Sequence, residues 1–171
     1  MHEVALGLGS SLGDRRGILE ATLRRLGARP DLHVARVSSW YRTPPLAGGT
    51  ARNWFLNGVA RLQTTLAPTD LLDLCMALED EAGRRRARLW GDRPLDLDLL
   101  LVDRLVLQTE RLVLPHPAIA HRPFVRTPLL EVWPDAADPR TATPFARMSP
   151  PPGPRPTPIG VVARGRPLRY L

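Results

Sequence analysis

The alternation of strand-like and helix-like apolar patterns over the first hundred residues is the feature that most restricts the fold of this chain. Apolar residues after position 17 recur at the spacing of one helix face, and Gly27 is expected to cap that helix. Pro68 is suited to the first position of a second helix. In chain order, the sequence predicts a strand over 4–8, a helix ending at Gly27, strands over 34–42 and 55–64, a helix over 68–82 and a strand over 95–102.

An order of strand, helix, two strands, helix and strand fits a split βαβ arrangement. We therefore predict an α+β fold with a ferredoxin-like βαββαβ core, a mainly antiparallel sheet and helices on one face. Residues 115–134 are expected to form a loop and a short helix, and 159–162 are a candidate for a further short strand. The chain is expected to divide into a domain over 1–138 and a Pro/Arg-rich C-terminal extension over 139–171, partly extended or flexible.

The basic residues are unusual in kind and in distribution. All 24 residues counted as lysine or arginine are arginines, which excludes every mechanism that needs a lysine. Residues 139–171 hold six arginines and no acidic residue, so the net charge of +7 leaves 18 − 17 = +1 for residues 1–138. A body this close to neutral argues against nucleic acid as a partner, although an RNA-binding module of the same topology is the best rival interpretation.

The lengths of the apolar segments bear on the cellular compartment and on contact with membranes. No apolar run approaches the ~20 residues of a membrane-spanning helix, and the first residues do not read as a secretory signal. Cys75 has no partner for an internal disulfide and is expected to be a small buried residue on a helix. We expect a cytoplasmic protein, a monomer, with no membrane contact.

Two carboxylates in an otherwise apolar strand carry the strongest chemical signal. In a strand, Asp96 and Asp98 point to the same face while the leucines between and around them point to the other. Their repulsion is relieved by a divalent cation, by a shared proton or by an arginine such as Arg93. The arginine-rich loop over 84–88, directly before the pair, favours a polyphosphate held jointly by Mg²⁺ and guanidinium groups.

A second pair of residues suits a flat heterocycle. Phe55 and Asn57 are two apart in a predicted strand, so one face offers both a stacking ring and an amide that donates and accepts hydrogen bonds. The alternative is an ordinary core phenylalanine beside an amide at a strand edge.

Taken together, eight groups of residues resemble hydroxymethyl-dihydropterin pyrophosphokinase of the folate pathway. They are Gly9-Ser10, Tyr-Arg-Thr-Pro-Pro-Leu over 41–46, Phe-Leu-Asn over 55–57, the stretch from Glu79 through Gly83-Arg84, Trp90-Gly91, Arg-Pro-Leu-Asp-Leu-Asp over 93–98, Leu-Pro-His-Pro over 114–117 and Arg-Pro-Phe over 122–124. The resemblance covers about residues 3–135. It implies a pyrophosphokinase domain over 1–138 that transfers the terminal diphosphate of ATP to the hydroxymethyl group of 6-hydroxymethyl-7,8-dihydropterin and releases AMP.

The resemblance also implies roles for individual residues. Asp96 and Asp98 match the ligands of two Mg²⁺ ions and, with Arg84 and Arg93, form the expected catalytic group. The ATP side is matched by Glu79, Arg84, Arg93, His116 and Arg122. The pterin pocket is matched by Thr43, Pro45, Leu46, Phe55, Asn57 and Phe124. Other folate enzymes that act downstream are possible partners.

Four departures from the family pattern accompany these matches. Ser11 stands where the family usually has asparagine, Phe55 stands where it often has tyrosine, and the loop over 84–90 is about one residue short. The extension from about Pro139 matches no part of the family pattern. A dinucleotide-binding turn at Gly7-Leu8-Gly9-Ser10-Ser11-Leu12-Gly13 is the other rival, but its third glycine is misplaced for that motif.

Overall fold

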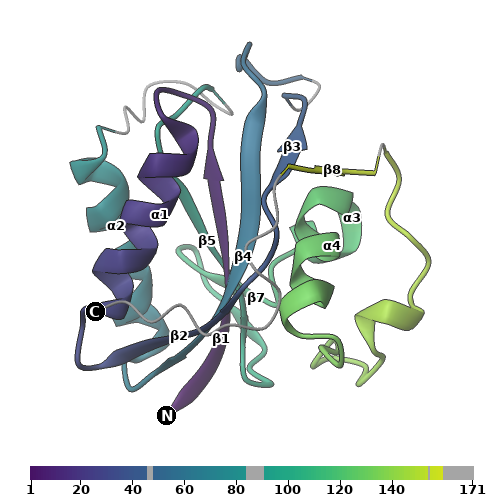
Figure 1. Ribbon diagram of the computed structural model, residues 1–171. Coiled ribbons are helices and arrows are strands. Elements are labelled where there is room, and N and C mark those ends of the chain that lie inside the picture. Colours follow the sequence, from purple (N-terminus) through teal and green to yellow (C-terminus); the bar gives the residue numbers. More distant parts are fainter. Residues whose placement is uncertain (46–47, 84–90, 154, 160–171) are drawn as a thin grey trace.

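Six strands form one antiparallel sheet through the middle of the molecule (Figure 1). The computed structural model describes residues 1–45, 48–83, 91–153 and 155–159. The sheet strands are β1 (His2–Ser10), β2 (Leu32–Val37), β3 (Tyr41–Thr43), β4 (Phe55–Thr64), β5 (Asp96–Val102) and β8 (Thr157–Pro158). Their order is β5-β1-β4-β3-β8, and β2 pairs with the far end of β4. The predicted α+β, ferredoxin-like βαββαβ core is confirmed.

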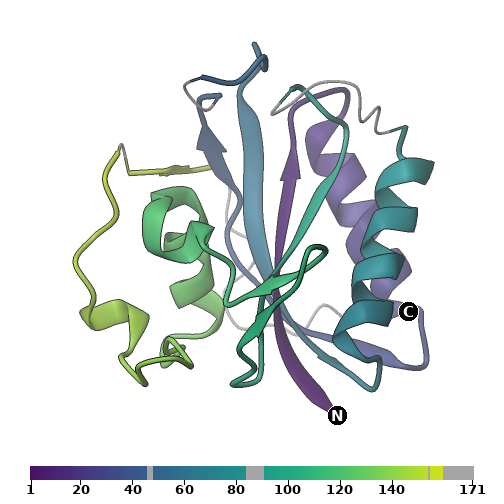
Figure 2. The same ribbon diagram turned by 180° about the vertical axis from the view of Figure 1, so that it is seen from behind.

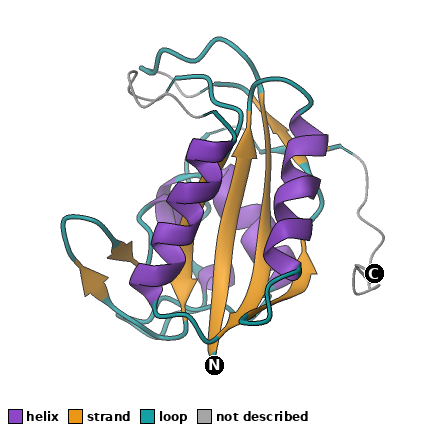
Figure 3. Ribbon diagram, turned by 90° about the vertical axis from the view of Figure 1, so that its left-hand side faces the viewer, coloured by secondary structure: helices purple, strands orange, loops and turns teal. Residues whose placement is uncertain are grey.

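The two helices of the βαββαβ core lie on one face of the sheet, as expected, and helices that follow the core cover the other face, which was not predicted. α1 (Arg15–Gly27) and α2 (Pro68–Glu81) lie side by side on one face, as Figure 3 shows. α3 (Ala118–His121), α4 (Pro123–Val132) and the 3₁₀ turn η1 (Phe145–Arg147) lie on the other, seen from behind in Figure 2. Each face therefore packs its own apolar cluster. The physical reason is that β5 ends in four consecutive buried apolar residues, 99–102, which need cover on both sides.

Local chemistry sets where the first half of the chain changes direction. The predicted strand over 34–42 is interrupted at Ser38, whose hydroxyl accepts the Val59 N–H at 2.9 Å in place of a regular ladder bond. Trp40 then packs over Gly58, where an added Cβ would lie 2.7 Å from the indole ring. The result is two short strands, β2 and β3, instead of one.

The two long helices follow the sequence closely. Asp14 caps α1 by accepting the Gly17 N–H at 3.0 Å, and Pro68 opens α2 as predicted. Gly27 is the last residue of α1 rather than its cap; Ala28 fills that place in a right-handed conformation that needs no glycine. Cys75 on α2 is buried as expected, and burial raises the pKa of its thiol to about 12.

The chain beyond α4 packs against the sheet and α4 over part of its length. A small hairpin of β6 (Leu107–Gln108) and β7 (Val113–Leu114) precedes α3. After α4, the ring of Phe145 packs into the apolar cluster on the α4 face of the sheet. The buried guanidinium of Arg126 donates to the backbone oxygens of Met148 and Ser149. β8 then runs along β3, just before the strand expected over 159–162, of which residues 160–162 lie outside the described residues. The division into 1–138 and 139–171 stays a prediction.

Along the stretches that the structure describes, no helix has both the length and the apolar character needed to cross a membrane.

Replacing Phe145 with alanine is expected to lower the free energy of unfolding by about 3–5 kcal/mol, because the ring is 1% exposed and its loss leaves a cavity beside α4. Urea denaturation followed by circular dichroism measures this. Leu105→Ala, at a side chain that is 38% exposed, is the control and should change stability by less than about 0.5 kcal/mol. A similarly small effect of Phe145→Ala would show that the extension does not stabilise the domain.

Candidate active site

Three neighbouring strands bring the predicted site residues to one face of the sheet. Gly9 in the central strand β1 pairs with Asn57 of β4 on one side and with Asp96 of β5 on the other. Two residues earlier, Gly7 pairs with Val59 and with Asp98. The two glycines leave a floor without side chains between the carboxylates and the amide.

A pocket opens over this floor, with about 730 Å³ of atom-free space that includes its opening to solvent. Its walls come from the sheet, from the loops at the ends of β3 and β5, and from the start of α4. The predicted residues that line it are Thr43, Phe55, Asn57, Arg93, Asp96, Asp98, Arg122 and Phe124.

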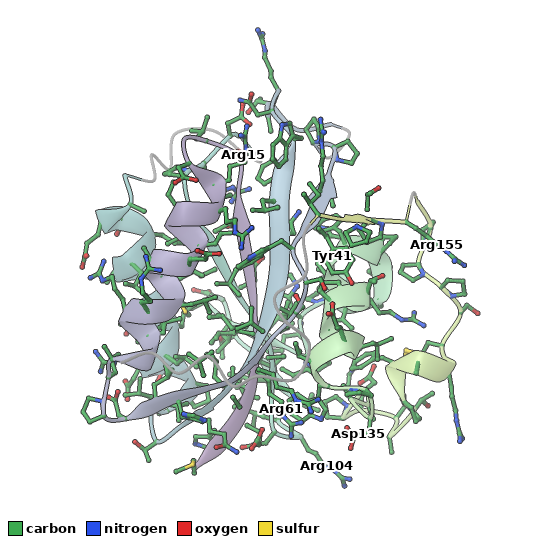
Figure 4. All side chains as sticks on the ribbon, in the orientation of Figure 1. Arg15, Tyr41, Arg61, Arg104, Asp135 and Arg155 are labelled. Carbon is green, nitrogen blue, oxygen red and sulfur yellow. The ribbon has the colours of Figure 1, made fainter. Side chains whose placement is uncertain are left out.

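α4 is fixed to the sheet beside this pocket. Tyr41, the first residue of β3, lies beside α4 (Figure 4), and its hydroxyl donates to Glu131 of α4 at 2.9 Å. The same carboxylate accepts the backbone N–H and the hydroxyl of Ser39. These contacts hold Phe124 and Arg122, at the start of α4, opposite the sheet.

The two aspartates face the pocket as the strand pattern predicts, while Leu95, Leu97 and Leu99 pack into the cluster under α1 and α2. Arg93 donates to Asp96 through a 2.9 Å ion pair, so Asp96 has an arginine partner. Within the described ranges, no group of three or more histidine, cysteine or acidic side chains is placed to hold a metal ion. Two carboxylates are hard oxygen donors that suit Mg²⁺, provided that substrate oxygens or water complete its coordination.

On the β4 side the amide of Asn57 is oriented by a neighbour. Its Nδ2 donates to the hydroxyl of Thr43 at 2.6 Å. Its Oδ1 then faces the floor and lies 2.9 Å from the place where a Cβ on Gly9 would be. Phe55 and Phe124 line the pocket from the sheet and from α4 respectively, so two rings border the same space.

Three of the predicted residues that the structure describes, Pro45, Glu79 and His116, are not among those that line the pocket. Pro44, rather than Pro45, contributes to its wall. Glu79 lies on the opposite side of β5, where its Oε1 accepts the Leu97 N–H at 2.7 Å. Leu46 and Arg84 lie outside the described residues.

His116, the remaining predicted residue outside the pocket lining, lies within electrostatic reach of it. Burial lowers the pKa of its ring, the positive charge of Arg122 lowers it further, and Asp96 acts in the opposite direction. The Nδ1 atom accepts the Ala118 N–H at 3.0 Å, so the neutral ring carries its hydrogen on Nε2. Arg122 also lies over the Phe124 ring, with its guanidinium carbon 6.0 Å from the ring centre.

Sequence reasoning missed the role of the floor. Gly7 and Gly9 alternate in a strand, the same spacing that the aspartates and the Phe55/Asn57 pair show. A missing side chain at two alternate strand positions signals a surface that another group approaches closely. That signal was available before the structure.

Comparisons with known proteins agree with this geometry. The family model of 7,8-dihydro-6-hydroxymethylpterin-pyrophosphokinase (HPPK) matches residues 5–134. The 2-amino-4-hydroxy-6-hydroxymethyldihydropteridine pyrophosphokinase of Methylorubrum extorquens is 42% identical over 135 residues, which are 79% of this chain and 85% of the relative. The enzyme of the same name from Pseudomonas aeruginosa is also 42% identical over 135 residues, 79% of this chain and 83% of the relative.

A solved structure supports the fold independently. The crystal structure of Plasmodium falciparum HPPK-DHPS matches with a TM-score of 0.60 at 15% identity, over 85% of this chain and 42% of that one. The matched residues 5–134 contain all of the described residues that line the pocket, from the glycine floor to the two aromatic walls. The chain therefore belongs to the 7,8-dihydro-6-hydroxymethylpterin-pyrophosphokinase family.

Proposed function

We propose that this one pocket holds both substrates of the family reaction, with the pterin over β4 and the phosphates of ATP over β5. The chain is a pyrophosphokinase of folate biosynthesis, with ATP and 6-hydroxymethyl-7,8-dihydropterin as its substrates. In the proposed reaction the hydroxymethyl oxygen bonds to the β-phosphorus of ATP and its proton passes to solvent, while the bond from that phosphorus to the α-phosphate oxygen breaks and AMP leaves.

The observation that carries this proposal is the position of Gly9 between Asn57 and Asp96. Adjacent strands are about 5 Å apart, so residues that share one register across β4, β1 and β5 are about 10 Å apart. A pterin at Asn57 and a triphosphate at Asp96 would therefore meet over the bare backbone of Gly9. Holding two reactants in contact supplies much of the rate enhancement in such transfers.

Binding of the pterin is assigned to the aromatic walls and the oriented amide. Phe55 and Phe124 would stack on the two faces of the heterocycle, and such contacts contribute about 0.5–1.5 kcal/mol per ring beyond burial. Asn57 Oδ1 would accept from an N–H of the pterin edge, while Thr43 keeps the amide in that orientation.

Binding of ATP is assigned to the other half of the pocket. Asp96 and Asp98 would hold Mg²⁺, with two ions expected, beside the guanidinium groups of Arg93 and Arg122. Mg²⁺ held there would neutralise charge on the phosphates and would lower the pKa of the substrate hydroxyl. The arginines supply fixed positive charge where the phosphate oxygens gain negative charge.

Replacing Phe124 with alanine is expected to weaken pterin binding by ~1–3 kcal/mol, about 5- to 150-fold, because stacking and burial are lost. ATP binding should remain close to that of the unchanged chain. Pterin fluorescence and titration calorimetry with a non-hydrolysable ATP analogue measure the two affinities. Phe145→Leu, at an aromatic side chain outside the pocket, is the matched control, and equal weakening of both ligands by Phe124→Ala would contradict the assignment.

Several expectations stay predictions. They are the roles of Pro45, Leu46, Glu79, Arg84 and His116 at the substrates, the monomeric state, the cytoplasmic location and any association with downstream folate enzymes.

A further inference from the structure

Asp92 ties together two loops that border the two halves of the pocket. Its Oδ2 atom accepts the backbone N–H of Arg52 at 3.0 Å, and its Oδ1 atom accepts that of Asn53 at 3.2 Å. The side-chain amide of Asn53 adds a third hydrogen bond to Oδ2 at 3.0 Å. One carboxylate in the loop before β5 thus holds the loop before β4 by three donors.

A third segment joins at the end of β1. Two hydrogen bonds join Ser11 to Arg93: the Ser11 N–H donates to the Arg93 carbonyl at 2.9 Å, and the Arg93 N–H donates to the Ser11 hydroxyl at 2.9 Å. Burial alone would raise the pKa of Asp92. The hydrogen bonds from Arg52, Asn53 and Ser11 lower it overall, so the carboxylate is ionised at neutral pH.

The residues on the two sides of this junction lie next to the proposed binding sites of different substrates. Asn53 lies two positions before Phe55, which borders the proposed pterin space. Arg93 directly follows Asp92 and pairs with Asp96 on the proposed phosphate side. A change at the junction therefore alters the position of one substrate relative to the other.

We propose that Asp92 is a positioning residue that sets the alignment of the pterin with the phosphates by fixing the loop before β4 to the loop before β5. Asp92 itself does not line the pocket. The inference rests on the proposed function, because it needs two substrates in the two halves of the pocket. Misplacement of reacting groups by about 1 Å costs of the order of a hundredfold in rate, so a modest loosening is measurable.

The test compares Asp92→Asn with Asp103→Asn. Asn at position 92 keeps the shape of the side chain but offers one acceptor atom to three donors. Asp103 is a matched control, because it also holds a backbone N–H, that of Glu3 at 2.8 Å, together with a side chain, His2, at the opposite end of β1. Relative to the wild-type constants, Asp92→Asn should raise the KM for the pterin about fivefold or more and lower kcat about fivefold or more. Its melting temperature should be no lower than that of Asp103→Asn. Asp103→Asn should leave both constants unchanged.

A swap of the two side chains separates positioning from general stability. Asn53→Asp alone places two carboxylates together and should impair turnover at least as much as Asp92→Asn. The double variant Asp92→Asn with Asn53→Asp restores the side-chain hydrogen bond and should recover part of kcat. Unchanged constants in Asp92→Asn, or additive losses in the double variant, would overturn the proposal. If the wild-type chain released no AMP, the proposed function would fail instead, and pterin affinity in the same variants would then decide the role of Asp92.

Discussion

Replacing Asp98 with alanine is expected to lower diphosphoryl transfer about a hundredfold or more while the fold remains intact. The change removes a hard oxygen donor from the pair that would hold Mg²⁺, and several kcal/mol of transition-state stabilisation are lost with it. Each 1.36 kcal/mol corresponds to about tenfold in rate. The melting temperature should stay the same or rise slightly, because repulsion between Asp96 and Asp98 is relieved. Turnover and thermal melts with and without Mg²⁺-ATP measure both effects.

Asp96 provides an informative comparison within the same pair. It forms the 2.9 Å ion pair with Arg93, and the side chains of both partners are about one-fifth exposed. Asp96→Ala should therefore lower turnover and also remove the ion pair with Arg93. Asp73→Ala on α2, at a side chain that is 58% exposed, is the surface control. An Asp98→Ala variant that melts much earlier yet keeps near-normal turnover would contradict the metal-ligand role.

Replacing Gly9 with alanine is expected to weaken pterin binding about tenfold or more. The added Cβ would lie 2.9 Å from Asn57 Oδ1, and the Asn57 amide is already held by Thr43, so it has little room to move. Overpacking of this kind costs about 1–3 kcal/mol. Pterin fluorescence titration measures the loss, and Gly9→Val should be worse.

Gly7→Ala is the matched control for this substitution. It lies on the same strand and the same face, but its Cβ would meet its nearest neighbours, Asp98 O and the Leu100 side chain, at 3.5 Å, an ordinary contact distance. Pterin affinity in Gly7→Ala should therefore be close to that of the unchanged chain. Equal losses in both variants would show that the strand, rather than the space above Gly9, is sensitive to substitution.

Features that depend on a short repeating pattern of side chains, or on local backbone chemistry, could be predicted from the sequence. The alternation of Asp96, Leu97 and Asp98 fixed which side chains share a face before any partner strand was known, and the structure confirms that face. The start of α2 at Pro68 follows from local backbone chemistry in the same way. Such features depend only on residues that are neighbours in the chain.

Features that depend on distant residues could not be predicted in this way. The break between β2 and β3 arises because Trp40 needs the space above Gly58, which lies in another strand. The carboxylate of Asp92 is bound by residues 39 and 40 positions earlier in the chain, and no periodic pattern marks that pairing. By contrast, the four consecutive apolar residues over 99–102 are a local signal of a strand that is buried on both faces, and the expectation of helices on one face did not use it.

The most direct measurement is the identity of both products when the purified chain is incubated with ATP, Mg²⁺ and 6-hydroxymethyl-7,8-dihydropterin. Attack at the β-phosphorus over Gly9 predicts AMP and the pterin diphosphate in equal amounts, separated by chromatography and identified by mass. ADP together with a pterin monophosphate would mean that the γ-phosphorus is attacked, and would contradict the arrangement of the two substrates proposed here.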